Sequence, residues 1–261
     1  MDLNLQGKTA LVIASSQGLG KAVAEQLVQE GVNVVISGRE EGKLQKVQKE
    51  LQQSGEGQVA YHCADIMNIE DIRSLVQFTR ETFGRIDILI NNAGGPPGGS
   101  FEQISDEDWQ KSFELNLLSY IRIIREVLPD MKKEGGRIIN IASTSIKQPI
   151  PGLILSNTFR LGIVGLTKTL SVELAPYNIL INTVAPGRIA TERTDHLDQM
   201  NADKQGISRE AAADQSKKAI PLGRYGTPEE FAKVVTFLVS EASTYITGSS
   251  VLVDGGMVTS I

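Results

Sequence analysis

Two glycines, Gly18 and Gly20, follow the apolar run 9–14 and open a segment with apolar residues at helical spacing. Glycines at such a turn let backbone N–H groups and the N-terminus of a helix approach a pyrophosphate. The same pair also fits a tight turn that binds no ligand. The turn is therefore a candidate phosphate-binding site, and its meaning depends on the elements around it.

Short apolar runs alternate with longer segments of helical period along the chain. The runs are nearly continuous in Val, Ile and Leu, as expected for strands buried on both faces of a parallel sheet. The predicted strands are 9–14, 33–37, 59–65, 86–94, 136–143, 179–187 and 249–256. The predicted helices are 20–31, 40–55, 69–84, 105–135, 156–177 and 227–243. This alternation predicts an α/β fold, a single doubly wound Rossmann-type domain over 1–261 whose parallel seven-stranded sheet has helices on both faces.

Two segments at the carboxyl ends of predicted strands depart from this pattern. Residues 188–220 are polar and lack a strand pattern, and α/β folds place ligand-covering loops at such positions. We expect them to form loops or helices that cover a substrate. Residues 94–100, GGPPGGS, fit either a plain connection or an irregular wall of the same pocket. We favour the wall.

Composition excludes several classes of protein. The chain has 261 residues, of which 41% are hydrophobic and 22% charged. Its net charge of −5, with scattered Lys and Arg, argues against a nucleic-acid surface. No apolar run is long enough to span a membrane, and the start lacks the pattern of a secretory signal. One cysteine, Cys63, fits a reducing compartment. We expect a cytoplasmic protein that does not act at membranes or on nucleic acids.

Several motifs along the chain together resemble one family. They are ALVIASSQGLGKAVA (10–24), CADI (63–66), NNAG (91–94), the strand ending at Ser143, VAPGRIATE (184–192) and TGSSVLVDGG (247–256). Their order is similar to the short-chain dehydrogenase/reductase family over about residues 5–257, and the C-terminal part is similar to its β-ketoacyl-carrier-protein-reductase branch. The resemblance implies a nicotinamide cofactor, a small carbonyl or alcohol substrate, and a homotetramer or dimer.

The resemblance also assigns the cofactor site. Asp65 matches the residue that holds the adenine amino group, NNAG the segment beneath the adenine-side ribose, and Thr191 the contact to the nicotinamide carboxamide. The predicted cofactor-binding residues are Ala14, Ser15, Ser16, Gln17, Gly18, Leu19, Gly20, Arg39, Asp65, Ile66, Asn92, Ala93, Gly94, Arg160, Pro186, Gly187, Ile189 and Thr191.

The glycine-rich turn departs from the family pattern, Thr-Gly-x-x-x-Gly-x-Gly. This chain has Ile13 and Ala14 at the first two positions. An alanine fits there if its φ is negative and is strained if its φ is positive. We therefore expect cofactor binding, weakened if Ala14 is strained.

The end of the second predicted strand favours NADP(H) over NAD(H). An NAD-binding fold usually has a carboxylate there, which accepts a hydrogen bond from the ribose 2′-OH and repels a 2′-phosphate. Here Ser37 and Gly38 leave room for the phosphate, and Arg39 offers a charge-assisted contact. Alternatively, Glu40 neutralises Arg39, which would then be an ordinary solvated side chain.

The catalytic motif departs more severely. The resemblance implies that Ser143 binds the carbonyl oxygen and that Asn116 positions a relay water. The family's tyrosine, which supplies the proton, and its lysine, which holds the ribose, fall at Ser156 and Arg160. An aliphatic hydroxyl is a far weaker acid than a phenol, and an arginine stays protonated. Arg160 can still fork onto the ribose hydroxyls, whereas proton transfer is lost.

Three other residues are candidates for roles at this site. Lys147, four residues after Ser143, could act as a substitute acid if desolvated, although a solvated loop lysine is the simpler interpretation. Tyr120 lies one turn after Asn116, where a core or interface role is favoured over catalysis. Arg188 fits either an anionic substrate group or an ion pair with Glu192. The two histidines, 62 and 196, are too isolated to suggest a metal, and we predict none.

Two hypotheses follow from these observations. The first is an NADP(H)-dependent oxidoreductase, similar to 3-oxoacyl-carrier-protein reductases, with an atypical Ser156/Arg160 site. The second is a catalytically weak or inactive dinucleotide-binding protein with a regulatory or partner role on the same scaffold. The retained positions 116 and 143 favour the first, and the missing phenol favours the second.

Overall fold

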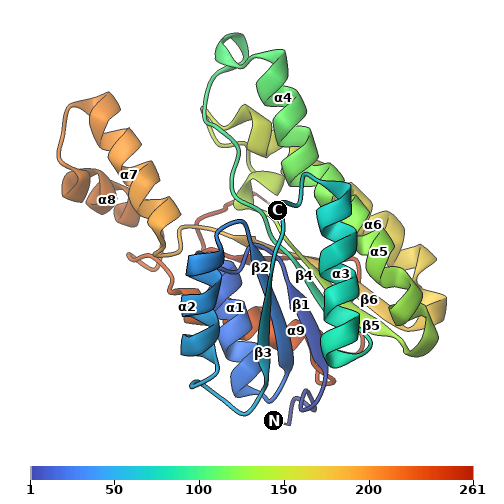
Figure 1. The fold of residues 1–261 in the computed structure, drawn as a ribbon. Helices are drawn as coiled ribbons and strands as arrows, with labels where there is room; N and C mark the ends of the chain where they lie inside the picture. The colour runs from blue at the N-terminus through green and yellow to red at the C-terminus, as the bar shows by residue number, and fades with distance from the viewer. Residues whose placement is uncertain (1, 261) are drawn as a thin grey trace.

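The computed structural model describes residues 2–260, and a seven-stranded sheet forms its centre (Figure 1). All neighbouring strands are parallel, in the order β3-β2-β1-β4-β5-β6-β7. The strands are β1 Thr9–Val12, β2 Asn33–Gly38, β3 Val59–Cys63, β4 Ile88–Asn91, β5 Gly136–Ile141, β6 Ile179–Pro186 and β7 Ser250–Val253. Each lies within or next to a predicted apolar run, which confirms the predicted parallel sheet.

Helices cover both faces of this sheet, as predicted. The α-helices are α1 Gly18–Gln29, α2 Glu41–Leu51, α3 Ile69–Phe83, α4 Asp106–Phe113, α5 Ser119–Glu134, α6 Ile154–Glu173, α7 Glu192–Gln205, α8 Arg209–Lys218 and α9 Pro228–Val239. Short 3-10 turns are η1 Phe101–Gln103, η3 Thr144–Ile146 and η4 Ala175–Tyr177, and η2 Glu114–Leu118 is a π-helical turn.

Alternation along the strands divides the core into two layers. Ala10 and Val12 of β1 pack with residues of α1, α2 and α9, whereas Leu11 and Ile13 pack with residues of α3, α5 and α6. Side chains of a strand point alternately to opposite faces, so each buried strand needs apolar residues at nearly every position. Burial of the strands on both faces therefore explains the continuous apolar runs of the sequence.

The segment 105–135, predicted as one helix, contains three elements. The α-helices α4 and α5 are joined by η2, where one turn is π-helical. A π turn accommodates an extra residue without ending the helix, and such turns are frequent at functional sites. Asn116 lies in this turn and is buried, so the irregular turn sets the direction of a predicted catalytic side chain.

The polar segment 188–220 forms two helices, α7 and α8, which stand out from the sheet on one side (Figure 1). Asp198 of α7 is buried, and its Oδ1 lies 3.0 Å from Nη1 of Arg188. The hydroxyl of Tyr225 donates to Oδ2 of Asp198 over 2.7 Å. A buried carboxylate held by a cation and a hydroxyl thus anchors helices that bury few apolar residues. Within residues 2–260, no helix has the length and apolarity needed to cross a membrane.

Candidate active site

A cleft of about 720 Å³ opens at the carboxyl ends of the strands, beside the β1/β4 pair. The strand order reverses at that pair, and ligands of doubly wound sheets bind at such a switch point. The predicted cofactor residues that line the cleft are Ala14, Ser16, Gln17, Gly18, Leu19, Arg39, Asp65, Ile66, Asn92, Ala93, Gly94, Arg160, Pro186, Gly187, Ile189 and Thr191. The remaining two, Ser15 and Gly20, are buried behind the turn.

The glycine-rich turn has two residues in the left-handed region, Ala14 at φ 49° and Gly18 at φ 59°. Glycine adopts this conformation freely, whereas an alanine is strained in it. Gly20 is needed for a different reason, because a Cβ there would lie 2.6 Å from the carbonyl oxygen of Ala14 and 2.9 Å from Nδ2 of Asn92. The turn therefore has the shape that the family pattern implies, with strain at Ala14.

Buried polar contacts hold this turn against the sheet. The hydroxyl of Ser15 donates to the carbonyl oxygen of Val12 over 2.7 Å and accepts from the backbone N–H of Ser37 over 3.0 Å. Nδ2 of Asn92 donates to the carbonyl oxygen of Ala14 over 3.1 Å. The turn is thus tied to both β2 and the segment after β4. The wall that would face a pyrophosphate is preformed.

The side chain of Glu40 does not neutralise Arg39. Glu40 pairs instead with Lys43 over 2.8 Å, and this hydrogen bond, followed by the Coulombic attraction of the same carboxylate, raises the pKa of Lys43. Arg39 is exposed at the cleft and makes no ion pair among residues 2–260. Of the two alternatives for Arg39, the structure favours the free cation.

Ser143, Ser156 and Arg160 come together at the other end of the cleft. Ser143 follows β5, and its Oγ accepts from the backbone N–H of Ser145 over 3.2 Å, which leaves its own proton to donate. Ser156 is buried on the first turn of α6. Asn157 beside it binds both the N–H and the C=O of Ile150, and so it fixes the loop that forms the cleft's rim.

The guanidinium of Arg160 turns inward, and the residue is only 5% exposed. Nη1 donates to the hydroxyl of Tyr120 over 3.1 Å and to the carbonyl oxygen of Ile141 over 3.0 Å, and Nη2 donates to the carbonyl oxygen of Ala93 over 3.2 Å. These acceptors engage three of its five N–H groups, while the residue still lines the cleft, so the expected contact to a ribose stays a prediction. In this structure Arg160 joins the ends of β4 and β5 beneath the cleft.

Tyr120 is fully buried, and its hydroxyl donates to the carbonyl oxygen of Ile141 over 3.0 Å. Burial raises the pKa of this phenol, and the charge of Arg160 opposes the rise only in part. The position fits the core role favoured from the sequence. A buried phenol with a raised pKa is a poor replacement for the absent proton donor.

Among the described residues 2–260, Asn116 and Lys147 do not line the cleft. Nδ2 of Asn116 donates to the carbonyl oxygen of Gly94 over 2.8 Å. Its Oδ1 is buried and has no hydrogen-bond partner among the described residues, which is compatible with the relay water that the resemblance implies. Lys147 is exposed beyond η3, so the structure does not desolvate the predicted substitute acid.

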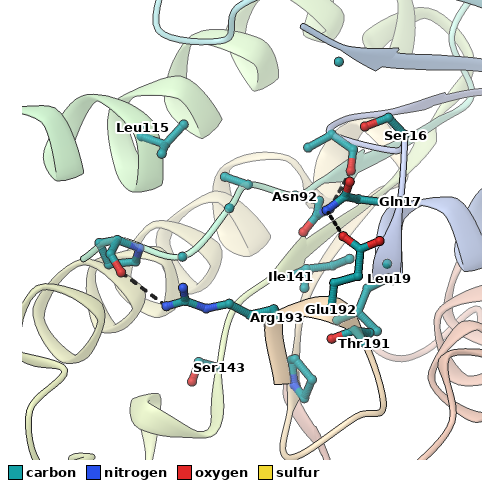
Figure 2. A pocket seen from close by; sticks show the side chains of 18 of the residues that line it. Ser16, Gln17, Leu19, Asn92, Leu115, Ile141, Ser143, Thr191, Glu192 and Arg193 are labelled. Carbon is teal, nitrogen blue, oxygen red and sulfur yellow. Dashed lines mark hydrogen bonds between the residues drawn. The ribbon is translucent and has the colours of Figure 1, made fainter. Parts of the chain in front are cut away.

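Arg188 and Glu192 each bind a partner other than the one considered. Arg188 pairs with Asp198, as described above, and Oε2 of Glu192 accepts from Nε2 of Gln17 over 3.0 Å (Figure 2). Sequence reasoning missed Arg193, the next residue, which also lines the cleft. Its only signal was its place two residues after Thr191, at the start of the covering segment.

A second cavity of about 360 Å³ adjoins the reaction end. It shares Ser143, Leu153, Leu197 and the segment 186–188 with the main cleft. The rest of its wall comes from the loop after η3, from α7 and from the C-terminal segment. The other apolar side chains that line it are Pro149, Ile150, Pro151, Met200, Met257 and Val258.

The fold and the cleft define a Rossmann-type protein with room for a dinucleotide at the sheet's switch point. A family model described as enoyl-(acyl carrier protein) reductase matches residues 13–258. The chain belongs to the short-chain dehydrogenase/reductase family.

Two curated relatives and two solved structures illustrate the similarity. The 3-oxoacyl-[acyl-carrier-protein] reductase FabG of Aquifex aeolicus is 36% identical over 98% of this chain and 100% of its own length. Dehydrogenase/reductase SDR family member 4 of Caenorhabditis elegans is 36% identical over 97% and 95%. The structure of L-sorbose reductase from Gluconobacter frateurii with NADPH and L-sorbose has a TM-score of 0.95 at 31% identity, covering 100% of both chains. That of a single-residue variant of the actinorhodin polyketide ketoreductase with NADPH has a TM-score of 0.92 at 33% identity, covering 96% and 97%.

Proposed function

We propose that this protein is an NADP(H)-dependent oxidoreductase that interconverts a small carbonyl compound and its alcohol. The observation that carries the proposal is the cleft itself, which joins the glycine turn and Thr191 to Ser143 at the reaction end. The names of its relatives, which include ketoacyl and sugar reductases, support the same reaction class.

The preference for NADP(H) rests on charge at the end of β2. Arg39 lines the cleft there without an ion pair among residues 2–260, Ser37 and Gly38 add no carboxylate, and the carboxylate of Glu40 is paired with Lys43. A 2′-phosphate would gain a charge-assisted hydrogen bond from Arg39. Two structural neighbours were crystallised with NADPH, which supports this choice.

The proposed reaction converts the carbonyl compound, a reduced nicotinamide and a proton into the alcohol and the oxidised nicotinamide. When bound, the cofactor would supply the hydride to the carbonyl carbon. Ser143 would donate a hydrogen bond to the carbonyl oxygen. Ser156 is a weak acid and Arg160 is engaged with internal acceptors, so solvent water would supply the proton. The loss of general acid assistance slows such a step by about 10²–10⁴.

We also propose that the protein is a homo-oligomer, a tetramer or a dimer. Leu161 and Val172 lie on one side of α6, with 54% and 75% of their surfaces exposed. Residues at this spacing share a helix face. An exposed apolar face typically marks a contact with another protein chain. Light scattering would give the mass. A cytoplasmic location, which the single cysteine favours, remains a prediction.

The second candidate function is a dinucleotide-binding partner protein without useful catalysis. The contacts of Arg160 favour it, because three of its N–H groups bind protein acceptors and no tyrosine is among the residues that line the cleft within 2–260. This candidate predicts NADPH binding with no hydride transfer.

Calorimetry with NADPH and NADH, followed by single-turnover oxidation of bound NADPH by a panel of ketones, separates the two candidates. We expect tighter binding of NADPH and slow oxidation, which the Ser143→Ala variant reduces further. Binding without oxidation by any ketone would establish the second candidate. No heat with either nucleotide would contradict both.

A further inference from the structure

The guanidinium of Arg193 lies against the glycine-rich segment 94–100, which follows β4. A Cβ at Gly95 would lie 3.0 Å from Nη2 of Arg193 and 3.3 Å from its Cζ. The missing side chain of Gly95 thus makes room for the guanidinium to lie against the backbone. Nη2 also donates to the carbonyl oxygen of Pro96 over 3.3 Å. The rim therefore holds a cation over the cleft.

This cation has no carboxylate partner within residues 2–260. Other arginines of the C-terminal half are neutralised: Arg188 by Asp198, Arg209 by Asp195 and Glu210, and Arg224 by Glu230. Arg193 commits one of its five N–H groups, in the hydrogen bond to Pro96. Arg193 is exposed overall, and the partial burial of its side chain, followed by the positive charge of Arg160, lowers its pKa. The reaction end thus carries uncompensated positive charge.

The direction of Arg193 separates it from the pyrophosphate end. Glu192 turns toward Gln17 of the glycine turn, whereas Arg193 points away from Gln17, to the side of the cleft where Ser143 and Leu115 lie (Figure 2). Adjacent residues of one helical turn thus serve opposite ends of the cleft. The free N–H groups of Arg193 are available to a ligand near Ser143.

The cavity beside Ser143 supplies the complementary surface. Its wall is largely apolar, with Ile150, Leu153, Met200 and Met257 among its members, and it also includes Lys204 and the paired Arg188. A carbonyl group bound at Ser143 would therefore have Arg193 on one side and a mostly apolar groove on the other. An oxo acid with an apolar tail matches this arrangement.

We propose that Arg193 is a specificity-determining residue that binds a carboxylate lying a few bonds from the reacting carbonyl or alcohol, so that the preferred substrates are oxo or hydroxy acids with apolar tails. This inference rests on the proposed function, since it assigns the substrate class of that site. A guanidinium and a carboxylate form paired, charge-assisted hydrogen bonds, which a neutral ester cannot replace.

The test compares 3-oxohexanoate with its methyl ester in steady-state oxidation of NADPH. In the Arg193→Met variant we expect kcat/KM for the acid to fall about 10–100-fold, with the ester changed less than about 3-fold. Arg193→Lys should restore part of the loss on the acid. Arg209→Met, which removes an exposed cation from α8, is the matched control and should change neither substrate.

A binding measurement keeps this inference distinct from the proposed reaction. Hexanoate, which cannot accept a hydride, should bind the NADP⁺ complex of the unaltered protein and lose about 10–100-fold in affinity in Arg193→Met. This result without any turnover would sustain carboxylate recognition while rejecting the oxidoreductase. Equal losses of kcat/KM for the acid and the ester would show that Arg193 acts by holding the rim through its hydrogen bond to Pro96. That result would overturn the inference. A tenfold loss of NADPH affinity in Arg193→Met would also overturn it, by assigning Arg193 to the cofactor.

Discussion

Nη1 of Arg160 lies 3.1 Å from the hydroxyl of Tyr120, and both groups bind the carbonyl oxygen of Ile141. The residue at the family's lysine position thus belongs to a buried network under the cleft. Because three of its five N–H groups bind protein acceptors, Arg160 stabilises the floor of the site and has at most two N–H groups left for a ligand.

Replacing Tyr120 with Phe should lower the free energy of unfolding by about 1–2 kcal/mol, because one acceptor of the buried guanidinium is lost. Urea denaturation measures the change. Tyr61→Phe, which alters a half-buried phenol that contacts Glu41, is the control and should cost less than about 0.5 kcal/mol. Equal effects of the two variants would show that the Arg160–Tyr120 contact contributes nothing.

The double variant Ser156→Tyr with Arg160→Lys should raise the rate of ketone reduction by about 10²–10⁴. A phenol at position 156 would supply the missing acid, and the rate should then decline as the pH rises through its pKa. Ser156→Phe with Arg160→Lys is the control without the hydroxyl. If the tyrosine and phenylalanine variants bind NADPH and react equally slowly, the absent acid is not what limits the rate.

Arg39→Asp should weaken NADPH binding by about 10–100-fold and leave NADH binding unchanged or improved, because the charge facing the 2′-phosphate is reversed. Fluorescence titration of both nucleotides measures the ratio. Lys46→Asp makes the same charge change on α2 outside the cleft lining, and it should leave the ratio unaltered. A parallel loss for both nucleotides would contradict the assignment of Arg39.

Ala14→Gly should raise the free energy of unfolding by about 0.5–1 kcal/mol, since glycine relieves the strain at φ 49°. Chemical denaturation measures the gain. Ala22→Gly, in the interior of α1, should instead lower the stability by about 0.5–1 kcal/mol. A loss of stability in Ala14→Gly would mean that the surrounding contacts compensate for the strained backbone.

Glu230 should titrate far below an ordinary carboxyl group. Its hydrogen bond to Arg224 is the largest of the causes that lower the pKa to about 2, followed by that to the N–H of Thr227. The folded pKa lies below the unfolded value of about 4.3. The contribution to stability is therefore complete above the unfolded pKa and is lost as the pH falls toward 2. NMR titration should show the pKa rising in Arg224→Met, and an unchanged value would refute the role of Arg224.

The sheet was predictable from the sequence because burial on both faces leaves a direct mark. Strands such as 179–187 consist almost entirely of apolar residues, and turns separate them. The π-helical turn η2 left no such mark, since one extra residue barely disturbs apolar spacings of three and four. Element boundaries and local helix type were therefore less predictable than the order of the elements.

The candidate site was predictable where one backbone turn determines it. Gly18 and Gly20 are required by local geometry, which sequence spacing records. The direction of Arg160 was not predictable, because its acceptors come from Ala93, Tyr120 and Ile141, three segments far apart in the chain. Arg193 was missed for the same reason, since only the folded chain places it against Gly95.

Because Glu192 and Arg193 point in opposite directions, the first turn of α7 contacts both the glycine-rich turn, at Gln17, and the segment after β4, at Pro96. A helix that swings away from Gln17 must carry its neighbouring side chain away from Pro96. If α7 moved as one body, the hydrogen bond of Glu192 to Gln17 and that of Arg193 to Pro96 would therefore be lost together. Such a movement would alter the contacts at both ends of the cleft at the same time.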